Sequence, residues 1–213
     1  MIAIIDYGVG NLFSLKSSLA QLGQDTVVTA DPDTIRKADR LILPGVGAFG
    51  DAMDKLVATG LVPVIRAEAE KKPLLGICLG MQMLFDESEE FGLHKGLGLI
   101  PGRVVRIPST DVQGRPQKVP HISWDPLNPA GGRTDFAGTV LAGVTPGEEC
   151  YFIHSYEAKP ADEADRLADT VYGSRAVCAA AAHGSVVGCQ FHPEKSGKVG
   201  LKIIEEYMKR AEK

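Results

Sequence analysis

The sequence of 213 residues has only four cysteines, a single tryptophan and no long apolar run. Its cysteines form no CxxC pair, which argues against a disulfide scaffold and the usual zinc motifs. We therefore expect free thiols in a reducing compartment, with no metal and no cofactor. No stretch approaches the roughly 20 apolar residues of a membrane-spanning helix, and the N-terminus lacks the features of a signal peptide. The sequence predicts a cytoplasmic protein that crosses no membrane.

An excess of positive charge is also missing. Lys and Arg number 23 against 27 Asp and Glu, and this net charge of −4 disfavours binding to nucleic acid or to an anionic membrane surface. Hydrophobic residues make up 44% of the chain and charged residues 23%, which is typical of soluble globular proteins. The length suits one domain and no composition shift marks a boundary, so we predict a single domain over residues 1–213.

The first 90 residues alternate between strand and helix patterns. Short apolar runs predict strands at Ile2–Asp6, Thr26–Ala30, Arg40–Leu43 and Pro73–Ile77. Leucines at helical spacing predict a helix that is capped by Asn11 and stopped by Gly23. Further helices are expected at Asp51–Ala58, Val62–Lys71 and Leu79–Asp86. This alternation is typical of βαβ units and a parallel sheet.

The second half of the chain reads mainly as strands. We expect them at Val104–Ile107, Lys118–Ile122, Tyr151–Tyr156, Ala176–Ala182 and Val186–Phe191, extending the sheet antiparallel and folding over it. Pro108–Gly132 is rich in Pro and Gly and is interpreted as surface loop around one short strand. A helix at Lys198–Lys209 closes the chain. The predicted fold class is α/β, with a doubly wound mixed, mainly parallel sheet and flanking helices.

The motif Gly76-Ile-Cys-Leu-Gly80 lies between a buried strand and a helix. A nucleophile on such a sharp turn needs small residues two positions to either side, because side chains there would collide with neighbouring backbone. The turn presents the Cys78 sulfur at a helix N-terminus, where the dipole favours a thiolate. It also directs the N–H of Leu79 to the place where an oxyanion would form. The pattern leaves open a second interpretation, a buried core cysteine beside packing glycines.

A thiol nucleophile usually needs a base and a group that orients the base. His192 ends an apolar strand before Pro193, and Glu194 can reach back to the second imidazole nitrogen. An exposed His/Glu pair at a strand end is the alternative. The other histidines are weaker candidates: His94 lies in a charged loop, and the three at positions 121, 154 and 183 have no nearby carboxylate in sequence. We interpret those at 154 and 183 as packed or solvated strand residues.

The turn Pro44-Gly-Val-Gly47 follows the third predicted strand. In a doubly wound sheet it lies at the same carboxyl edge as Cys78. Its glycines let a backbone N–H point towards a reacting carbonyl and complete an oxyanion hole with Leu79. An ordinary tight turn is the alternative for this segment alone. Nucleophile, oriented base and oxyanion loop at one sheet edge together favour a cysteine-dependent active site.

These motifs resemble those of the class I, or triad, glutamine amidotransferases over essentially the whole chain. The likeness is carried by Asp6-Tyr-Gly-Val-Gly-Asn-Leu12, Pro44-Gly-Val-Gly-Ala-Phe-Gly50, Gly76-Ile-Cys-Leu-Gly-Met-Gln-Met-Leu-Phe85, Pro120-His121, Tyr151-Phe-Ile-His-Ser-Tyr156 and Phe191-His-Pro-Glu-Lys-Ser196. Within the family, Met81 and Lys195 make the sequence most similar to the glutaminase subunits of histidine biosynthesis.

The resemblance implies a flavodoxin-like fold and a site that hydrolyses L-glutamine to glutamate and ammonia through a thioester. It implies a triad of Cys78, His192 and Glu194, an oxyanion region of Val46, Gly47 and Leu79, and glutamine-binding positions at Gln82, Glu90, Ser155 and Tyr156. It also implies a (β/α)8-barrel cyclase partner in a heterodimer, with Asn11 and Trp124 at the interface. A different ammonia acceptor, as in sugar amination, and a catalytically inactive regulatory subunit are the alternatives.

Trp124 suits an interface on its own evidence as well, because it is the sole tryptophan and lies in a Pro-rich segment. One departure from the family concerns the same segment. The family usually reads His-Met-Gly-Trp-Asn there, whereas this chain reads His121-Ile-Ser-Trp-Asp125. Ser123 and Asp125 therefore leave the docking geometry open.

Overall fold

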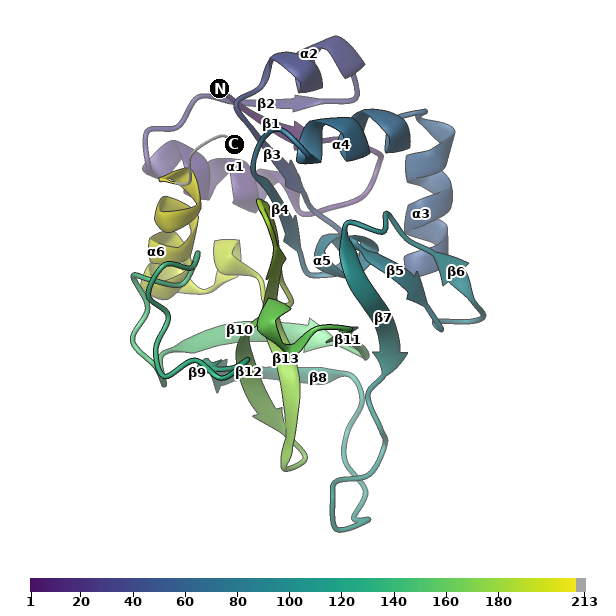
Figure 1. Cartoon of the computed structure of the whole chain (residues 1–213), viewed down its shortest axis with the longest axis vertical. Helices are drawn as coiled ribbons and strands as arrows, with labels where there is room; N and C mark the ends of the chain where they lie inside the picture. Colours follow the sequence, from purple (N-terminus) through teal and green to yellow (C-terminus); the bar gives the residue numbers. More distant parts are fainter. Residues whose placement is uncertain (210–213) are drawn as a thin grey trace.

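The computed structural model describes residues 1–209, and its frame is an eight-stranded sheet in the order β2-β1-β3-β4-β14-β13-β12-β9 (Figure 1). Neighbouring strands from β2 to β14 pair in parallel, and those from β14 to β9 pair antiparallel. The bounds of these strands are β1 Ile2–Ile5, β2 Thr26–Thr29, β3 Arg40–Leu43, β4 Leu74–Ile77, β9 Asn128–Pro129, β12 Arg166–Tyr172, β13 Arg175–His183 and β14 Val186–Cys189. The expected doubly wound, mainly parallel sheet is confirmed.

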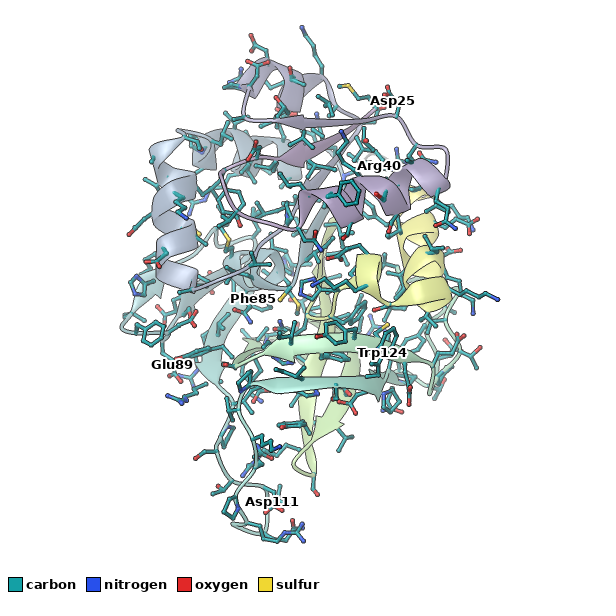
Figure 2. The ribbon with its side chains drawn as sticks, turned by 180° about the vertical axis from the view of Figure 1, so that it is seen from behind. Asp25, Arg40, Phe85, Glu89, Asp111 and Trp124 are labelled. Atoms are coloured by element: carbon teal, nitrogen blue, oxygen red, sulfur yellow. The ribbon has the colours of Figure 1, made fainter. Side chains whose placement is uncertain are left out.

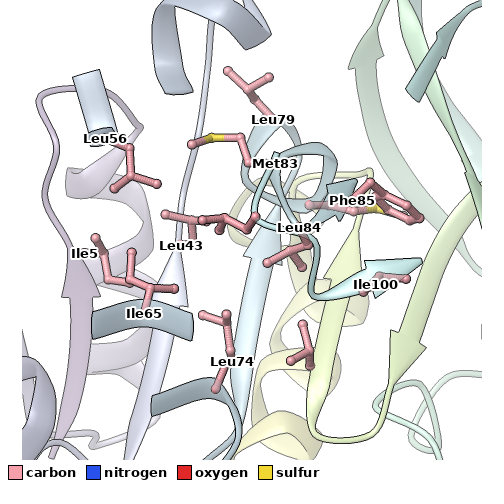
Figure 3. Packing of buried hydrophobic residues seen from close by; sticks show 14 of the residues in the cluster. Ile5, Leu43, Leu56, Ile65, Leu74, Leu79, Met83, Leu84, Phe85 and Ile100 are labelled. Atoms are coloured by element: carbon pink, nitrogen blue, oxygen red, sulfur yellow. The ribbon is translucent and has the colours of Figure 1, made fainter. Parts of the chain in front are cut away.

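Helices cover both faces of this sheet. They are α1 Leu12–Gln21, α2 Pro32–Lys37, α3 Phe49–Ala58, α4 Val62–Ala69, α5 Leu79–Met83 and α6 Gly197–Met208. Because side chains alternate along a strand, Ile4 packs with α1 and α6 in one core, while Ile5 packs with α2 to α5 in the other. Figure 3 shows the second core, in which Leu56 and Ile65 lie opposite Leu43 and Leu74. The parallel strands of the sheet are thereby packed between two helical layers.

Two smaller sheets complete the fold. One pairs β8 (His121–Pro126) with β10 (Glu149–His154), and the other has the order β11-β7-β5-β6. The bounds of the latter strands are β5 Phe85–Ser88, β6 His94–Lys95, β7 Ile100–Arg106 and β11 Tyr156–Pro160. Ser155 joins β10 to β11, so the chain changes sheets at this residue. Two 3₁₀ turns, Glu163–Asp165 and Pro193–Lys195, precede β12 and α6.

Several expectations about local structure were wrong. The helix after Cys78 ends at Met83, because Phe85 and the residues after it pair with β7 instead. Trp124 lies in β8 and not in a loop. The strand expected at Lys118–Ile122 begins only at His121, and the strand expected at Tyr151–Tyr156 ends at His154, before β11 begins. The elements α2, β5, β6, β9, β11 and β12 were not expected. The segment between β7 and β8 projects from the body with Asp111 near its tip (Figure 2).

Within residues 1–209, no helix has both the length and the apolar character that crossing a bilayer requires.

Candidate active site

Cys78 occupies a sharp turn between β4 and α5, with φ of 54° and ψ of −112°. Positive φ is uncommon for a residue with a side chain, so the turn is held by its surroundings. A Cβ at Gly80 would lie 1.9 Å from the carbonyl oxygen of Leu43, and one at Gly76 would lie 2.7 Å from that of Gly80. Both glycines are therefore required by close backbone approach, which is the reason given for them from the sequence.

His192 is buried between the end of β14 and the 3₁₀ turn Pro193–Lys195, beside Cys78. Its Nδ1–H donates to Glu194 Oε1 at 2.8 Å, which leaves Nε2 for Cys78. Two further hydrogen bonds fix the backbone here: Ser196 Oγ donates to the His192 carbonyl at 2.7 Å, and Tyr151 N donates to Ser196 Oγ at 3.0 Å. The structure thus brings Cys78, His192 and Glu194 together as the sequence predicted, with the base oriented by a carboxylate.

The electrostatics favour a charged His192. Burial alone lowers its pKa, but hydrogen bonds with Cys78 and Glu194 and the negative charges of both outweigh burial and raise the pKa of His192 to about 9. The imidazolium therefore persists at neutral pH beside the sulfur that it would pair with as a thiolate. The helix α5 that follows Cys78 is five residues long, shorter than expected from the sequence.

This pKa predicts how stability depends on pH. The folded-state value lies above 6.5, so the stabilisation from His192 is fully present below about pH 6.5 and is lost as the pH rises through about 9. We expect urea unfolding of the wild type to show this decline, and we expect Glu194→Gln to diminish it because the amide lacks the charge. Glu149→Gln, on the exposed side of β10, is the matched control. A decline that is the same in Glu194→Gln as in the wild type would contradict the assignment.

A cavity of about 340 Å³ opens in front of Cys78. Its lining contains most of the residues that the sequence or the resemblance proposed: Val46, Gly47, Cys78, Leu79, Gln82, Glu90, Ser155, Tyr156 and His192. Glu90 Oε2 accepts a hydrogen bond of 2.7 Å from the N–H of Phe49 at the start of α3. The volume is at the lower end of the range for small-molecule sites, which suits a single amino acid.

The proposed oxyanion loop lines the same cavity as His192. Gly47 has φ of 98°, a conformation that a side chain would strain. The hydroxyl of Tyr7 donates to the carbonyl oxygen of Pro44 at 2.7 Å and anchors the start of this loop. Val46 and Gly47 border the same cavity as Leu79, so their backbone N–H groups are candidates for holding an oxyanion.

Sequence reasoning missed Gln190. It is fully buried, and its Nε2 donates to Cys78 Sγ at 3.9 Å, a long contact with sulfur. Its Oε1 accepts from Gln82 Nε2 at 3.0 Å, which sets the direction of the Gln190 amide towards the sulfur. His154, which had been interpreted as a packed or solvated residue, also lines the cavity. The motifs Gln190-Phe-His192 and Tyr151-Phe-Ile-His154 contained the only sequence signal for both residues.

Two residues proposed for a partner interface lie on the same side as the site. Asn11 caps α1, accepting from Ser14 N at 3.5 Å as expected, and lines a small cavity beside Glu194. Trp124 is 49% exposed and lies against Tyr151, with ring centroids 5.9 Å apart, on the β8–β10 pair (Figure 2). Ile122 and Ile153 are also exposed on this pair. Its outer surface is therefore apolar and centred on Trp124.

Comparison with known proteins shows the family to which the chain belongs. Residues 3–210 match the family model described as glutamine amidotransferase class-I. The chain belongs to the class-I glutamine amidotransferases, enzymes that release ammonia from the side-chain amide of glutamine.

Particular relatives narrow this class. "Imidazole glycerol phosphate synthase subunit HisH 1" of Legionella pneumophila (strain Lens) is 45% identical over 208 residues, which are 97% of this chain and 98% of that protein. "Imidazole glycerol phosphate synthase subunit HisH" of Geobacillus kaustophilus (strain HTA426) is 50% identical over 209 residues, which are 98% of this chain and 96% of that protein.

Solved structures share the fold at lower identity. One described as "Crystal structure of glutamine amidotransferase" superposes with a TM-score of 0.71 at 19% identity, covering 98% of this chain and 100% of that one. PurLQS from Thermotoga maritima gives a TM-score of 0.68 at 20% identity, covering 97% of this chain and 96% of that one. At this level of sequence identity, these similarities establish the fold alone.

Proposed function

We propose that the chain is the glutaminase subunit of an imidazole glycerol phosphate synthase and hydrolyses L-glutamine to glutamate and ammonia. The observation that carries the proposal is the pair of Cys78 and His192 on one cavity, with Glu194 bound to the far nitrogen of His192. Support for the particular synthase comes from relatives of that name at 45% and 50% identity over nearly the full chain.

In the proposed reaction, the Cys78 thiolate attacks the amide carbon of glutamine, and the carbonyl π electrons move to oxygen. Backbone N–H groups of Leu79 and of the Val46–Gly47 segment hold this oxyanion. His192 Nε2–H protonates the leaving nitrogen, the C–N bond breaks, and ammonia leaves a thioester on Cys78. Water deprotonated by the same Nε2 then attacks the thioester, which releases glutamate and restores the thiolate.

The remaining cavity residues would hold the amino-acid end of glutamine. The Gln82 amide donates its two N–H groups to the Tyr156 carbonyl and to Gln190 Oε1. The amide oxygen of Gln82 is therefore available to accept from an α-ammonium group. The Glu90 carboxylate, positioned by Phe49 N–H, supplies the complementary negative charge. Ser155 and Tyr156 line the opposite wall, where the α-carboxylate is proposed to bind.

The ammonia would pass to a (β/α)8-barrel cyclase subunit bound over Asn11 and Trp124. There it would react with a phosphoribulosyl-formimino carboxamide ribonucleotide to give imidazole glycerol phosphate and an aminoimidazole carboxamide ribotide. The four free cysteines suit a reducing compartment, and the proposed heterodimer is assigned to the cytoplasm. An inactive regulatory subunit would not need the oriented His192–Glu194 pair, and the names of the relatives do not favour sugar amination as the acceptor chemistry.

The test measures glutamate and imidazole glycerol phosphate formed by the chain alone and with the cyclase subunit of the same organism. We expect slow hydrolysis alone, and faster hydrolysis coupled one-to-one to imidazole glycerol phosphate with the partner. Hydrolysis without transfer to this acceptor would overturn the synthase assignment. Failure to hydrolyse glutamine in both conditions would overturn the glutaminase assignment.

Trp124 is predicted to anchor the partner. Truncation of a central aromatic anchor commonly costs about 2 kcal/mol of binding free energy, so Trp124→Ala should weaken the complex roughly thirtyfold. Calorimetric titration with the cyclase measures this loss, and thermal melting of the isolated chain should change little because the side chain is half exposed. Val171→Ala, at an exposed position on β12, is the matched control. Unchanged affinity, or loss of a stable isolated chain, would contradict the anchor role.

A further inference from the structure

The inner side of β8 carries a polar cluster that the proposed mechanism does not use. Ile122 and Trp124 point outward, and the alternating residues His121, Ser123 and Asp125 lie on the other side of the strand. His121 has no exposed surface and is stacked between the rings of Tyr172 and Phe152, at centroid distances of 4.1 and 5.2 Å. Ser123 and Asp125, two of the departures from the family sequence, therefore lie away from the Trp124 side of the strand.

These side chains form a continuous hydrogen-bonded chain that ends at the glutamine cavity. His121 Nε2 lies 2.5 Å from Asp125 Oδ2, and Ser123 Oγ donates to the same carboxylate oxygen. His121 Nδ1 lies 3.0 Å from His154 Nε2. His154 Nδ1 lies 2.8 Å from the carbonyl oxygen of Tyr156. The expectation that His121 has no nearby carboxylate was therefore wrong. Asp125 follows His121 by four residues and contacts it on the same side of the strand.

The direction of each hydrogen bond in this series follows from the groups at its two ends, the Tyr156 carbonyl and the Asp125 carboxylate. A carbonyl oxygen only accepts, so His154 Nδ1 carries a hydrogen and donates to Tyr156 O. Burial lowers the pKa of His154 to about 3, and the hydrogen bond to Tyr156, which raises this pKa, does not offset burial and the nearby His121 and His192. The His154 ring is therefore neutral, and its Nε2 accepts. His121 Nδ1 must then donate.

The other nitrogen of His121 faces acceptors. Asp125 Oδ2 and Ser123 Oγ, the latter at 2.9 Å, both lie against His121 Nε2 and engage this nitrogen, which leaves the Nδ1–H of His121 to face His154. That donor forces His154 into the tautomer with the hydrogen on Nδ1. In the opposite tautomer, the lone pair of Nδ1 would face the Tyr156 oxygen at 2.8 Å, an arrangement that is repulsive.

The Tyr156 carbonyl connects this chain to the glutamine-binding groups. It accepts a second hydrogen bond, from Gln82 Nε2 at 3.0 Å, and Gln82 in turn donates to Gln190. His154 also bridges its own junction, because Nδ1–H of residue 154 binds the carbonyl two residues on, across Ser155. The tautomer of His154 thus affects the positions of Gln82, Ser155 and Tyr156 together.

We propose that His121 and Asp125 are positioning residues for glutamine binding, which act by fixing the tautomer of His154 and through it the Tyr156 carbonyl and the Gln82 amide. This inference rests on the proposed glutaminase function. It assigns to Ser123 and Asp125 a role inside the subunit, separate from the docking of a partner on Trp124.

Two substitutions at His121 separate hydrogen bonding from packing. The side-chain amide nitrogen of asparagine occupies nearly the place of the imidazole Nδ1, so His121→Asn keeps a donor for His154. The amide nitrogen of glutamine occupies nearly the place of Nε2, so His121→Gln keeps the contact with Asp125 and loses the donor for His154. Both variants lose the ring stacking, so a purely structural role would affect them alike.

The measurement is the concentration dependence with which a glutamine-like diazoketone inactivates Cys78 in the full chain. For His121→Gln we expect the half-saturating concentration to rise about tenfold, the factor equivalent to about 1.4 kcal/mol, with the limiting rate within about threefold of the wild type. His121→Asn should stay within about threefold for both quantities. Equal effects of the two variants, or an effect confined to the limiting rate, would overturn the proposal.

Asp125 provides a second pair in case the ring variants do not fold, since its side chain is partly exposed. Asp125→Asn can still accept from His121, whereas Asp125→Leu cannot, so only the leucine variant should raise the half-saturating concentration. Methyl methanethiolsulfonate, which has no glutamine-like group, should modify Cys78 at the wild-type rate in every variant. A fall in that rate parallel to the fall with the diazoketone would overturn the proposal. If the diazoketone fails to modify Cys78 of the wild type, the glutaminase function itself fails.

Discussion

Cys78→Ser is expected to reduce glutamine hydrolysis to background, a loss of about 10⁴-fold or more. A serine hydroxyl is not ionised by a neighbouring imidazole in the ground state as a thiol is, so His192 would have no thiolate to pair with. The substitution removes no packing volume of consequence, and the strained backbone at this position is held by Gly76 and Gly80. Fold and partner binding should therefore be unchanged.

The assay is glutamate release with the cyclase present, with circular dichroism and complex formation as checks on the fold. Cys178→Ala is the matched control, because Cys178 is a buried thiol on β13 outside the cavity. It should keep most of the activity. Substantial hydrolysis by Cys78→Ser, or an equal loss in Cys178→Ala, would be incompatible with Cys78 as the nucleophile.

The second large effect is expected at His192. His192→Ala should be almost as damaging as Cys78→Ala, because the alanine removes both the partner of the thiolate and the proton donor for ammonia. Residues that act as one unit are strongly non-additive, so the double variant should be little worse than either single one. Glu194→Gln should retain more activity, since Glu194 is bonded to Nδ1 of the base and does not line the cavity in front of Cys78.

Kinetics of the four variants under identical conditions decide this point. If the losses from Cys78→Ala and His192→Ala multiply in the double variant, the two residues act independently and the paired mechanism is wrong. If Glu194→Gln is as damaging as His192→Ala, then Glu194 has a direct chemical role that its position does not suggest.

Local sequence patterns predicted most of the strands and helices in the first half of the chain, where each element is short and has a clear hydrophobic pattern. The strands up to β4 and the elbow around Cys78 follow from apolar runs and from glycines whose added Cβ would strike backbone. The second half was less predictable because its strands pair over long sequence distances. Phe85 begins a strand only because β7 lies beside it, and Trp124 belongs to a strand only because β10 pairs with β8.

The candidate site shows the same division. Cys78, His192 and Glu194 carry local signals, and the structure brings them together, although their chemical roles remain predictions. Gln190 and His154 lie in motifs that the sequence singled out, but no local pattern indicated a role for either, because their importance comes from contacts with groups far away in the sequence. Gln190 contacts a sulfur 112 residues distant, and His154 contacts a ring 33 residues distant. Such contacts follow from the fold and not from spacing.

The central claim is that one thiol of the four attacks glutamine, and the mapping of covalent modification tests it most directly. Burial raises the pKa of Cys150 and of Cys178 to about 12 and raises the pKa of Cys189 further, so these three thiols are unreactive at neutral pH. After treatment of the native chain with a glutamine-like diazoketone, peptide mass spectrometry should find one adduct, on Cys78, whose formation is slowed by L-glutamine. An adduct on any of the other three cysteines with Cys78 unmodified would contradict the account.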